Sequence, residues 1–171
     1  MTTNVANRKL ESVPLWIFGS TGMLGGELMR LLEQHPALKP TAVSRKSGSL
    51  AETQPHVKLA VPQASIEAAE LALAAALEAG PAAVALSLPH GESGELWKRL
   101  RSQLGTRVEN LTLVDLAADF RLRDPELYRS TYSHAHPCPE ELEGFAYGLP
   151  EFHRASIVEA RRAAEIGRAH V

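Results

Sequence analysis

The sequence predicts an α/β protein in which a doubly wound parallel sheet is covered by helices on both faces. Short apolar runs alternate four times with segments of helical periodicity along the first 116 residues, and parallel strands need connections long enough to hold a helix. The runs VPLWIF and AAVALSL are continuously apolar, which is typical of strands buried on both faces. A chain of 171 residues is long enough for one core of this kind.

The apolar runs give the expected strands, at 13–18, 41–44, 82–88 and 111–116. Helices are expected at about 24–32, 66–79 and 96–104, where apolar residues recur every three or four positions. Ser65 is placed to cap the second helix, and Gly105 is placed to end the third. The pattern weakens from about residue 118, so we expect irregular loops over 118–155.

The composition describes a soluble globular protein without a nucleic-acid partner. Hydrophobic residues make up 44% of the chain and charged residues 22%, and the formal net charge is −2, unlike the basic balance that polyanions attract. The longest apolar run, around residues 71–80, is much shorter than the roughly 20 residues of a membrane span. A single cysteine cannot form an internal disulfide, as expected for a cytoplasmic protein.

Residues 19–25 read GSTGMLG and place three glycines three positions apart, between a strand and a helix. A helix N-terminus has unpaired N–H donors and a positive dipole end, and glycines let the backbone approach a pyrophosphate closely. We therefore expect a Rossmann-type dinucleotide site, with hydroxyl donors added by Ser20 and Thr21. The alternative is a tight strand-to-helix turn without a ligand.

The end of the second expected strand reads Ser44-Arg45-Lys46. Sites selective for NADP place cations there, opposite the 2′-phosphate of the adenosine ribose, whereas NAD-selective sites place a carboxylate. The sequence therefore favours NADP, and the alternative is a solvated basic loop. A short-chain dehydrogenase is excluded as the reaction type, because none of the three tyrosines is followed four positions later by the lysine of a Tyr-x-x-x-Lys pair.

Four segments in order resemble one enzyme family: GSTGMLGGEL at 19–28, SLPHGES at 87–93, VDLAADFRLRD at 114–124 and YGLPE at 147–151. The chain up to about residue 164 is similar to N-acetyl-gamma-glutamyl-phosphate reductase, which is related to aspartate-semialdehyde dehydrogenase. The resemblance implies a cytoplasmic, NADPH-dependent enzyme of arginine biosynthesis, whose full-length form is a homo-oligomer. Such an enzyme captures an acyl phosphate as a cysteine thioester and reduces it to an aldehyde.

By position, the resemblance places 19–24 around the pyrophosphate, 44–46 at the ribose phosphate and 87–90 beside the nicotinamide. The expected cofactor-binding residues are Gly19, Ser20, Thr21, Gly22, Met23, Leu24, Ser44, Arg45, Lys46, Leu88, Pro89 and His90. Asp119 and Arg121 are expected to pair with each other, either shaping the substrate pocket or, as we favour, bracing the strand end.

Cys138, between Pro137 and Pro139, is not expected to be the nucleophile. Reactive cysteines lie beside cations or helix N-termini, and the proline that follows supplies no N–H for an oxyanion. The resemblance also implies a nucleophile in an Asn-Pro-Gly-Cys segment after YGLPE, and this chain does not contain that segment. No metal is expected at His134, His136 and Cys138, since a fourth ligand at familiar spacing is missing.

The resemblance divides the chain into an N-terminal extension at 1–12, a nucleotide-binding domain at 13–164 and a tail at 165–171. We expect the tail to be foreign, because one back-translation of EIGRAHV contains the opening of a common DNA-sequencing adapter, and we expect the family's catalytic domain to be missing. The chain would then bind NADP and a small-molecule substrate without converting the substrate. Two alternatives stay open: a carrier-protein-linked glutamyl or aminoadipyl phosphate reductase of lysine biosynthesis, and a non-catalytic NADP sensor.

Overall fold

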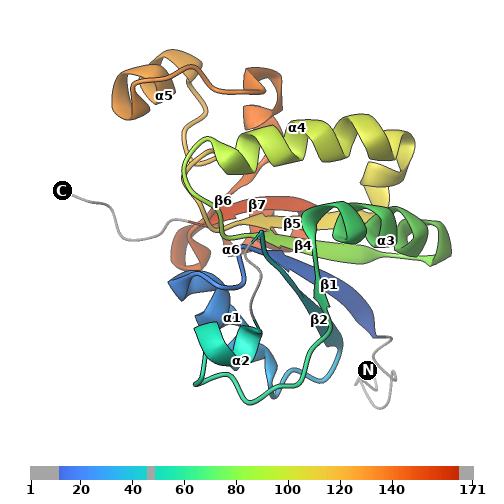
Figure 1. The fold of residues 1–171 in the computed structure, drawn as a ribbon. Coiled ribbons are helices and arrows are strands. Elements are labelled where there is room, and N and C mark those ends of the chain that lie inside the picture. Colours follow the sequence, from blue (N-terminus) through green and yellow to red (C-terminus); the bar gives the residue numbers. More distant parts are fainter. Residues whose placement is uncertain (1–11, 46–48, 166–171) are drawn as a thin grey trace, which may run out of the picture.

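A seven-stranded sheet runs through the protein (Figure 1), in a computed structural model that describes residues 12–45 and 49–165. The strand order is β3-β2-β1-β4-β5-β7-β6, and every neighbouring pair is parallel. The strands are β1 (Val13–Phe18), β2 (Leu38–Val43), β3 (Gln63–Ala64), β4 (Ala82–Leu86), β5 (Leu111–Asp115), β6 (Ala146–Gly148) and β7 (Arg162–Glu165). The expected α/β class with a Rossmann-type parallel sheet is confirmed.

Helices cover both faces of this sheet, with α3 and α4 on one side and α1 and α2 on the other (Figure 1). The helices are α1 (Met23–Leu32), α2 (Leu50–Thr53), α3 (Ile66–Ala79), α4 (Glu92–Leu104), α5 (Pro125–Tyr132) and α6 (Pro150–Glu159), with 3-10 turns η1 (Gly105–Asn110) and η2 (Pro139–Gly144). Within β1, Trp16 and Phe18 join the apolar cluster of α3 and α4, whereas Leu15 and Ile17 join the cluster of α1. This alternation is why the run reads as continuously apolar.

Two expected helix boundaries are confirmed. The Ser65 hydroxyl accepts a hydrogen bond from the N–H of Ala68 at 3.2 Å and caps α3. Gly105 follows α4 with a φ of +55°, a left-handed value that favours glycine. Both boundaries depend on local chemistry, which a sequence reveals directly.

The segment 118–155 is more regular than expected. It contains α5, η2, β6 and the start of α6, and β7 follows α6 in the chain. Strand β7 lies between β5 and β6, and its Ala164 is fully buried. The side chain of Glu141 ties this region to α4, because it accepts from the indole N–H of Trp97 at 3.2 Å and from Arg162 at 2.9 Å.

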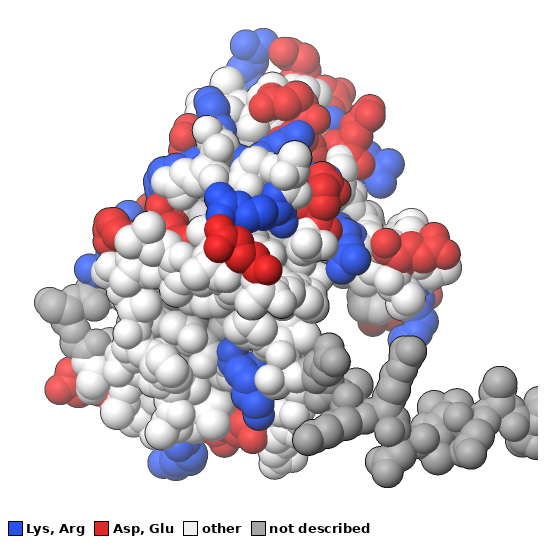
Figure 2. Space-filling model, turned by 90° about the vertical axis from the view of Figure 1, so that its right-hand side faces the viewer, with Lys and Arg blue, Asp and Glu red and all other residues white. Residues whose placement is uncertain are grey.

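Charges of both signs intermingle on the face shown in Figure 2. Ion pairs connect α3 to its neighbours, with Glu70 held by Arg99 at 2.6 Å and Glu78 by Arg107 at 2.7 Å. Among residues 12–45 and 49–165, no helix is both long and apolar enough to cross a bilayer.

The strand order reverses between β1 and β4. Strand β2 follows β1 on one side, whereas β4 lies on the other. Loops that leave the carboxyl ends of β1 and β4 therefore diverge and open a crevice, the place where open α/β sheets bind ligands.

Candidate functional site

The glycine turn lies at this crevice and is shaped by close packing. Gly19 follows β1 with a φ of +83°, and a Cβ built on it would lie 2.0 Å from the carbonyl oxygen of Ser87, after β4. A Cβ on Gly25 would lie 2.4 Å from the carbonyl oxygen of Gly19. Any side chain at either position would push the strand, turn and helix apart, so both glycines are required by the fold.

Gly22 has a different role, because it is exposed and caps the N-terminus of α1 without a side chain. The first turn of α1, starting with Met23 and Leu24, contains no acidic residue. The side chains of both residues are exposed. N–H groups in a first helical turn have no partner within the helix, and they attract anions.

Ser20 and Thr21 differ in orientation. The Ser20 hydroxyl is fully buried and donates to the carbonyl of Val43 at 3.1 Å, so its predicted role as a hydroxyl donor to the pyrophosphate is wrong. It instead anchors the turn to the end of β2. The Thr21 hydroxyl is partly exposed and lies 3.3 Å from the hydroxyl of Ser44, and both residues line a cavity.

A cavity of about 210 Å³ opens between these loops. The residues that line it come from the ends of β1, β2 and β4 and the start of α3: Phe18, Gly19, Thr21, Gly22, Val43, Ser44, Arg45, Ile66, Ser87, Leu88 and Pro89. Seven of the predicted residues therefore meet in one place. A second cavity of about 710 Å³ adjoins it, and Arg45, Ile66 and Leu88 line both.

Arg45 is positioned where the sequence predicts the ribose phosphate, but it has a protein partner. Its guanidinium forms an ion pair with Glu92, in the first turn of α4, with 2.9 Å between Nη2 and Oε2. Lys46 lies outside the described residues. Neither Ile66 nor Glu92 was predicted, because Ile66 follows a two-residue strand and Glu92 is 47 positions from Arg45.

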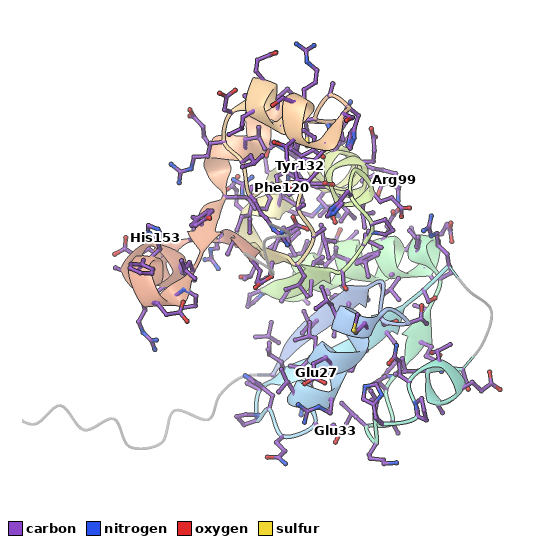
Figure 3. The ribbon with its side chains drawn as sticks, turned by 90° about the vertical axis from the view of Figure 1, so that its left-hand side faces the viewer. Glu27, Glu33, Arg99, Phe120, Tyr132 and His153 are labelled. Atoms are coloured by element: carbon purple, nitrogen blue, oxygen red, sulfur yellow. The ribbon has the colours of Figure 1, made fainter. Side chains whose placement is uncertain are left out.

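Contacts from Tyr132 and Asp119 hold the loop of Leu88, Pro89 and His90 in place. The His90 ring packs on Tyr132 with 5.3 Å between the ring centroids, and Tyr132 comes from α5, beside α4 (Figure 3). Asp119 accepts from the backbone N–H groups of Gly91 and Gly94, each at 2.8 Å. Its fully buried carboxylate therefore caps α4 from a distant segment.

The prediction that Asp119 and Arg121 pair with each other is wrong. The hydroxyl of Tyr128 donates to Asp119 at 3.0 Å, and the Arg121 Nε–H donates to the backbone carbonyl of Glu165 at 2.9 Å. The two side chains point apart because residues 118–121 form a turn after β5, so that their side chains do not share one face. Burial, followed by the charge of Asp119, raises the pKa of Tyr128 above its ordinary value.

Cys138 is buried, and its thiol lies 3.6 Å from the carbonyl oxygen of Gly94. Burial, followed by the charge of Glu140, raises the pKa of the thiol to about 12. Both features disfavour the thiolate that a nucleophile requires. The two neighbouring histidines form hydrogen bonds within the protein. Nδ1 of His136 accepts from the Cys138 N–H at 3.1 Å, and Nε2 of His134 lies 3.1 Å from the Tyr128 hydroxyl.

Comparison with known proteins gives the family. Residues 15–160 match the family model described as the NAD-binding domain of semialdehyde dehydrogenase. The chain is similar to N-acetyl-gamma-glutamyl-phosphate reductases, at 36% identity for Dehalococcoides mccartyi and 38% for Ruegeria pomeroyi, over 88% of this chain and 41% and 42% of those proteins. It is also 37% identical to the [LysW]-L-2-aminoadipate 6-phosphate reductase of Deinococcus radiodurans, over 92% of this chain and 42% of that protein.

The chain thus spans about two fifths of the length of these curated relatives. Their names agree on reduction of an acyl phosphate and differ in the molecule that carries it. Because the matched domain covers most of this sequence, the protein belongs to the semialdehyde dehydrogenase family of oxidoreductases and contains its NAD(P)-binding domain.

Proposed function

We propose that this chain is the NADP-binding part of an enzyme that reduces N-acetyl-glutamyl 5-phosphate to N-acetyl-glutamate 5-semialdehyde and releases phosphate. The observation that carries the proposal is the N-terminus of α1, which is capped by Gly22 alone and opens into the crevice between β1 and β4. A bare helix start at this position suits a pyrophosphate. The names of the relatives support the reaction.

Each part of the crevice has a role in this proposal. The turn from Gly19 to Gly22 binds the pyrophosphate, and Arg45 binds the 2′-phosphate that distinguishes NADP from NAD. The apolar side chains of Ile66 and Leu88, which line both cavities, suit the flat face of the adenine. NADPH supplies the hydride when it is bound.

The thioester step needs a thiolate beside the cofactor. The only cysteine of the sequence is Cys138, and its burial and raised pKa make it unsuitable. We therefore expect the isolated chain to bind NADPH without converting an acyl phosphate. Turnover by the purified chain would contradict this expectation.

A second substrate class is favoured by one observation, the 37% identity to the aminoadipate phosphate reductase. This value is close to the 36% and 38% identity to the N-acetyl-gamma-glutamyl-phosphate reductases. In this alternative, the acyl phosphate is attached to a carrier protein. The crevice described here contacts the cofactor in both cases, so it supports the dinucleotide equally for either substrate.

Isothermal titration calorimetry of the chain with NADPH and NADH tests the cofactor proposal. We expect both to bind and NADPH to bind more tightly, because Arg45 interacts with the additional phosphate. Equal affinities would contradict the assignment of Arg45, and no binding of either would contradict the proposed function. Thr21→Ala is a useful control, since it removes a hydroxyl from the pyrophosphate turn and should weaken both ligands to the same degree.

A further inference from the structure

We propose that Glu92 is a specificity-determining residue that competes with the 2′-phosphate of NADP for Arg45 and so limits the preference for the phosphorylated cofactor. The proposal rests on the proposed function, since it concerns the same crevice. It assigns a role to an acidic residue that forms an ion pair with Arg45, which is expected to bind the 2′-phosphate.

The geometry brings these two residues together from different elements. Arg45 follows β2, and Glu92 begins α4. Both carboxylate oxygens of Glu92 lie close to Nη2 of Arg45, at 2.9 Å and 3.2 Å. Both side chains line the larger cavity, and Arg45 also lines the smaller one. The ion pair therefore stands at the junction of the two cavities, where the adenosine ribose would lie.

The charges decide the direction of the effect. A 2′-phosphate can reach the guanidinium only by sharing it with the carboxylate or by displacing it, and the displaced carboxylate stays close to a group that carries up to two negative charges. A cofactor without the 2′-phosphate has no group that pairs with Arg45, so the ion pair between Arg45 and Glu92 can remain.

The pair is partly exposed, with 62% of the Arg45 side chain and 38% of the Glu92 side chain accessible. Exposed pairs contribute little to stability, so substitutions here should leave the fold intact. For the same reason, the expected effect on binding is moderate and depends on salt.

The test compares two fragments of the cofactors, 2′,5′-ADP and 5′-ADP, by isothermal titration at low ionic strength. In Glu92→Gln, we expect 2′,5′-ADP to bind about three- to tenfold more tightly, and 5′-ADP to change by less than about twofold. The gain should shrink as salt is added. It should also disappear in the double variant Arg45→Gln and Glu92→Gln, where no guanidinium is left to compete for.

Glu95→Gln is the matched control. Glu95 lines the same larger cavity from the same turn of α4, so this variant removes an equal charge without touching the ion pair. Its effect on the ratio of the two affinities should be clearly smaller than that of Glu92→Gln. A thermal melt of each variant checks that the fold is intact.

The outcomes separate the two proposals. If the unmodified chain binds neither fragment, the proposed function fails and the inference fails with it. If it binds both, but Glu92→Gln leaves the ratio of affinities unchanged, only the inference fails. Weaker binding of 2′,5′-ADP in Glu92→Gln would also overturn it, since Glu92 would then orient Arg45 towards the phosphate.

Discussion

Replacing Asp119 should destabilise the start of α4 and lower the free energy of unfolding by more than the loss of an ordinary helix cap does. Its fully buried carboxylate receives three hydrogen bonds, from the N–H groups of Gly91 and Gly94 at 2.8 Å and from the Tyr128 hydroxyl at 3.0 Å. Hydrogen bonds to charged groups contribute about 1.5–3 kcal/mol each, but burying the charge offsets part of this sum. An ordinary cap contributes about 0.5–2 kcal/mol.

In Asp119→Asn, one carboxylate oxygen becomes an NH₂ group that cannot accept from an N–H donor. If the remaining oxygen keeps Gly91 and Tyr128, the amide faces the N–H of Gly94, and two donors meet. We expect the free energy of unfolding to fall by about 2 kcal/mol for Asn, and by about 4 kcal/mol for Ala, which removes the shared acceptor of all three donors. Urea unfolding followed by circular dichroism at pH 7 measures both values.

Asp124→Asn provides the control for this measurement. Asp124 caps α5 through the N–H groups of Glu126 and Leu127, at 2.8 Å and 3.3 Å, at an exposed position. Asn and Asp are about equally good caps at such sites, so we expect a loss below about 0.5 kcal/mol. Equal losses at the two positions would refute the claim that Asp119 supports the loop of His90 from a distance.

Three further predictions concern buried groups. Burial, followed by the charge of Asp119, raises the pKa of Asp115 from 3.8 to about 6. Because the folded state then binds the proton more tightly than the unfolded state, the free energy of unfolding should fall by up to about 3 kcal/mol as the pH rises from about 4 to about 6. Urea unfolding of Asp115→Asn should lack that part of the pH dependence. Gly19→Ala should lower the free energy of unfolding by more than about 2 kcal/mol and abolish NADPH binding, because its Cβ would lie 2.0 Å from the Ser87 oxygen, whereas Gly80→Ala, with no atom within 4 Å of its Cβ, should do neither. The Cys138 thiol should react with a disulfide reagent far more slowly in the native protein than in urea, given its burial and a pKa of about 12; fast labelling of the native protein would contradict its assignment as a structural residue.

The sequence predicted those parts of the fold that local chemistry determines. Strands β1, β4 and β5 are apolar runs, and the N-terminal cap of α3 and the C-terminal end of α4 depend on residues next to them in the chain. Strands β3, β6 and β7 are only two to four residues long, and β6 and β7 read AYG and RAAE. Nothing in such segments favours a strand locally. They are extended because neighbouring strands supply their hydrogen bonds, and those neighbours are distant in the sequence.

The site shows the same division. The sequence predicts which residues would surround a cofactor, and seven of these residues line one cavity. It could not show that the Ser20 hydroxyl points into the sheet, or that Arg45 meets a carboxylate 47 positions away. Side-chain direction in a turn depends on dihedral angles that the residue type leaves open. Partners across the crevice depend on the tertiary structure as a whole.

The two helix N-termini at the crevice explain why the glycine turn, rather than the loop after β4, is suited to the pyrophosphate. Helices α1 and α4 both begin there, and each N-terminus attracts negative charge. At α4 that charge is already present within the protein, since Asp119 accepts from its first N–H groups and Glu92 and Glu95 occupy its first turn. At α1 the cap is a glycine, and no carboxylate lies in the first turn. An anion entering the crevice is therefore repelled from one helix and attracted to the other, which favours the N-terminus of α1 as the pyrophosphate site in the proposed function.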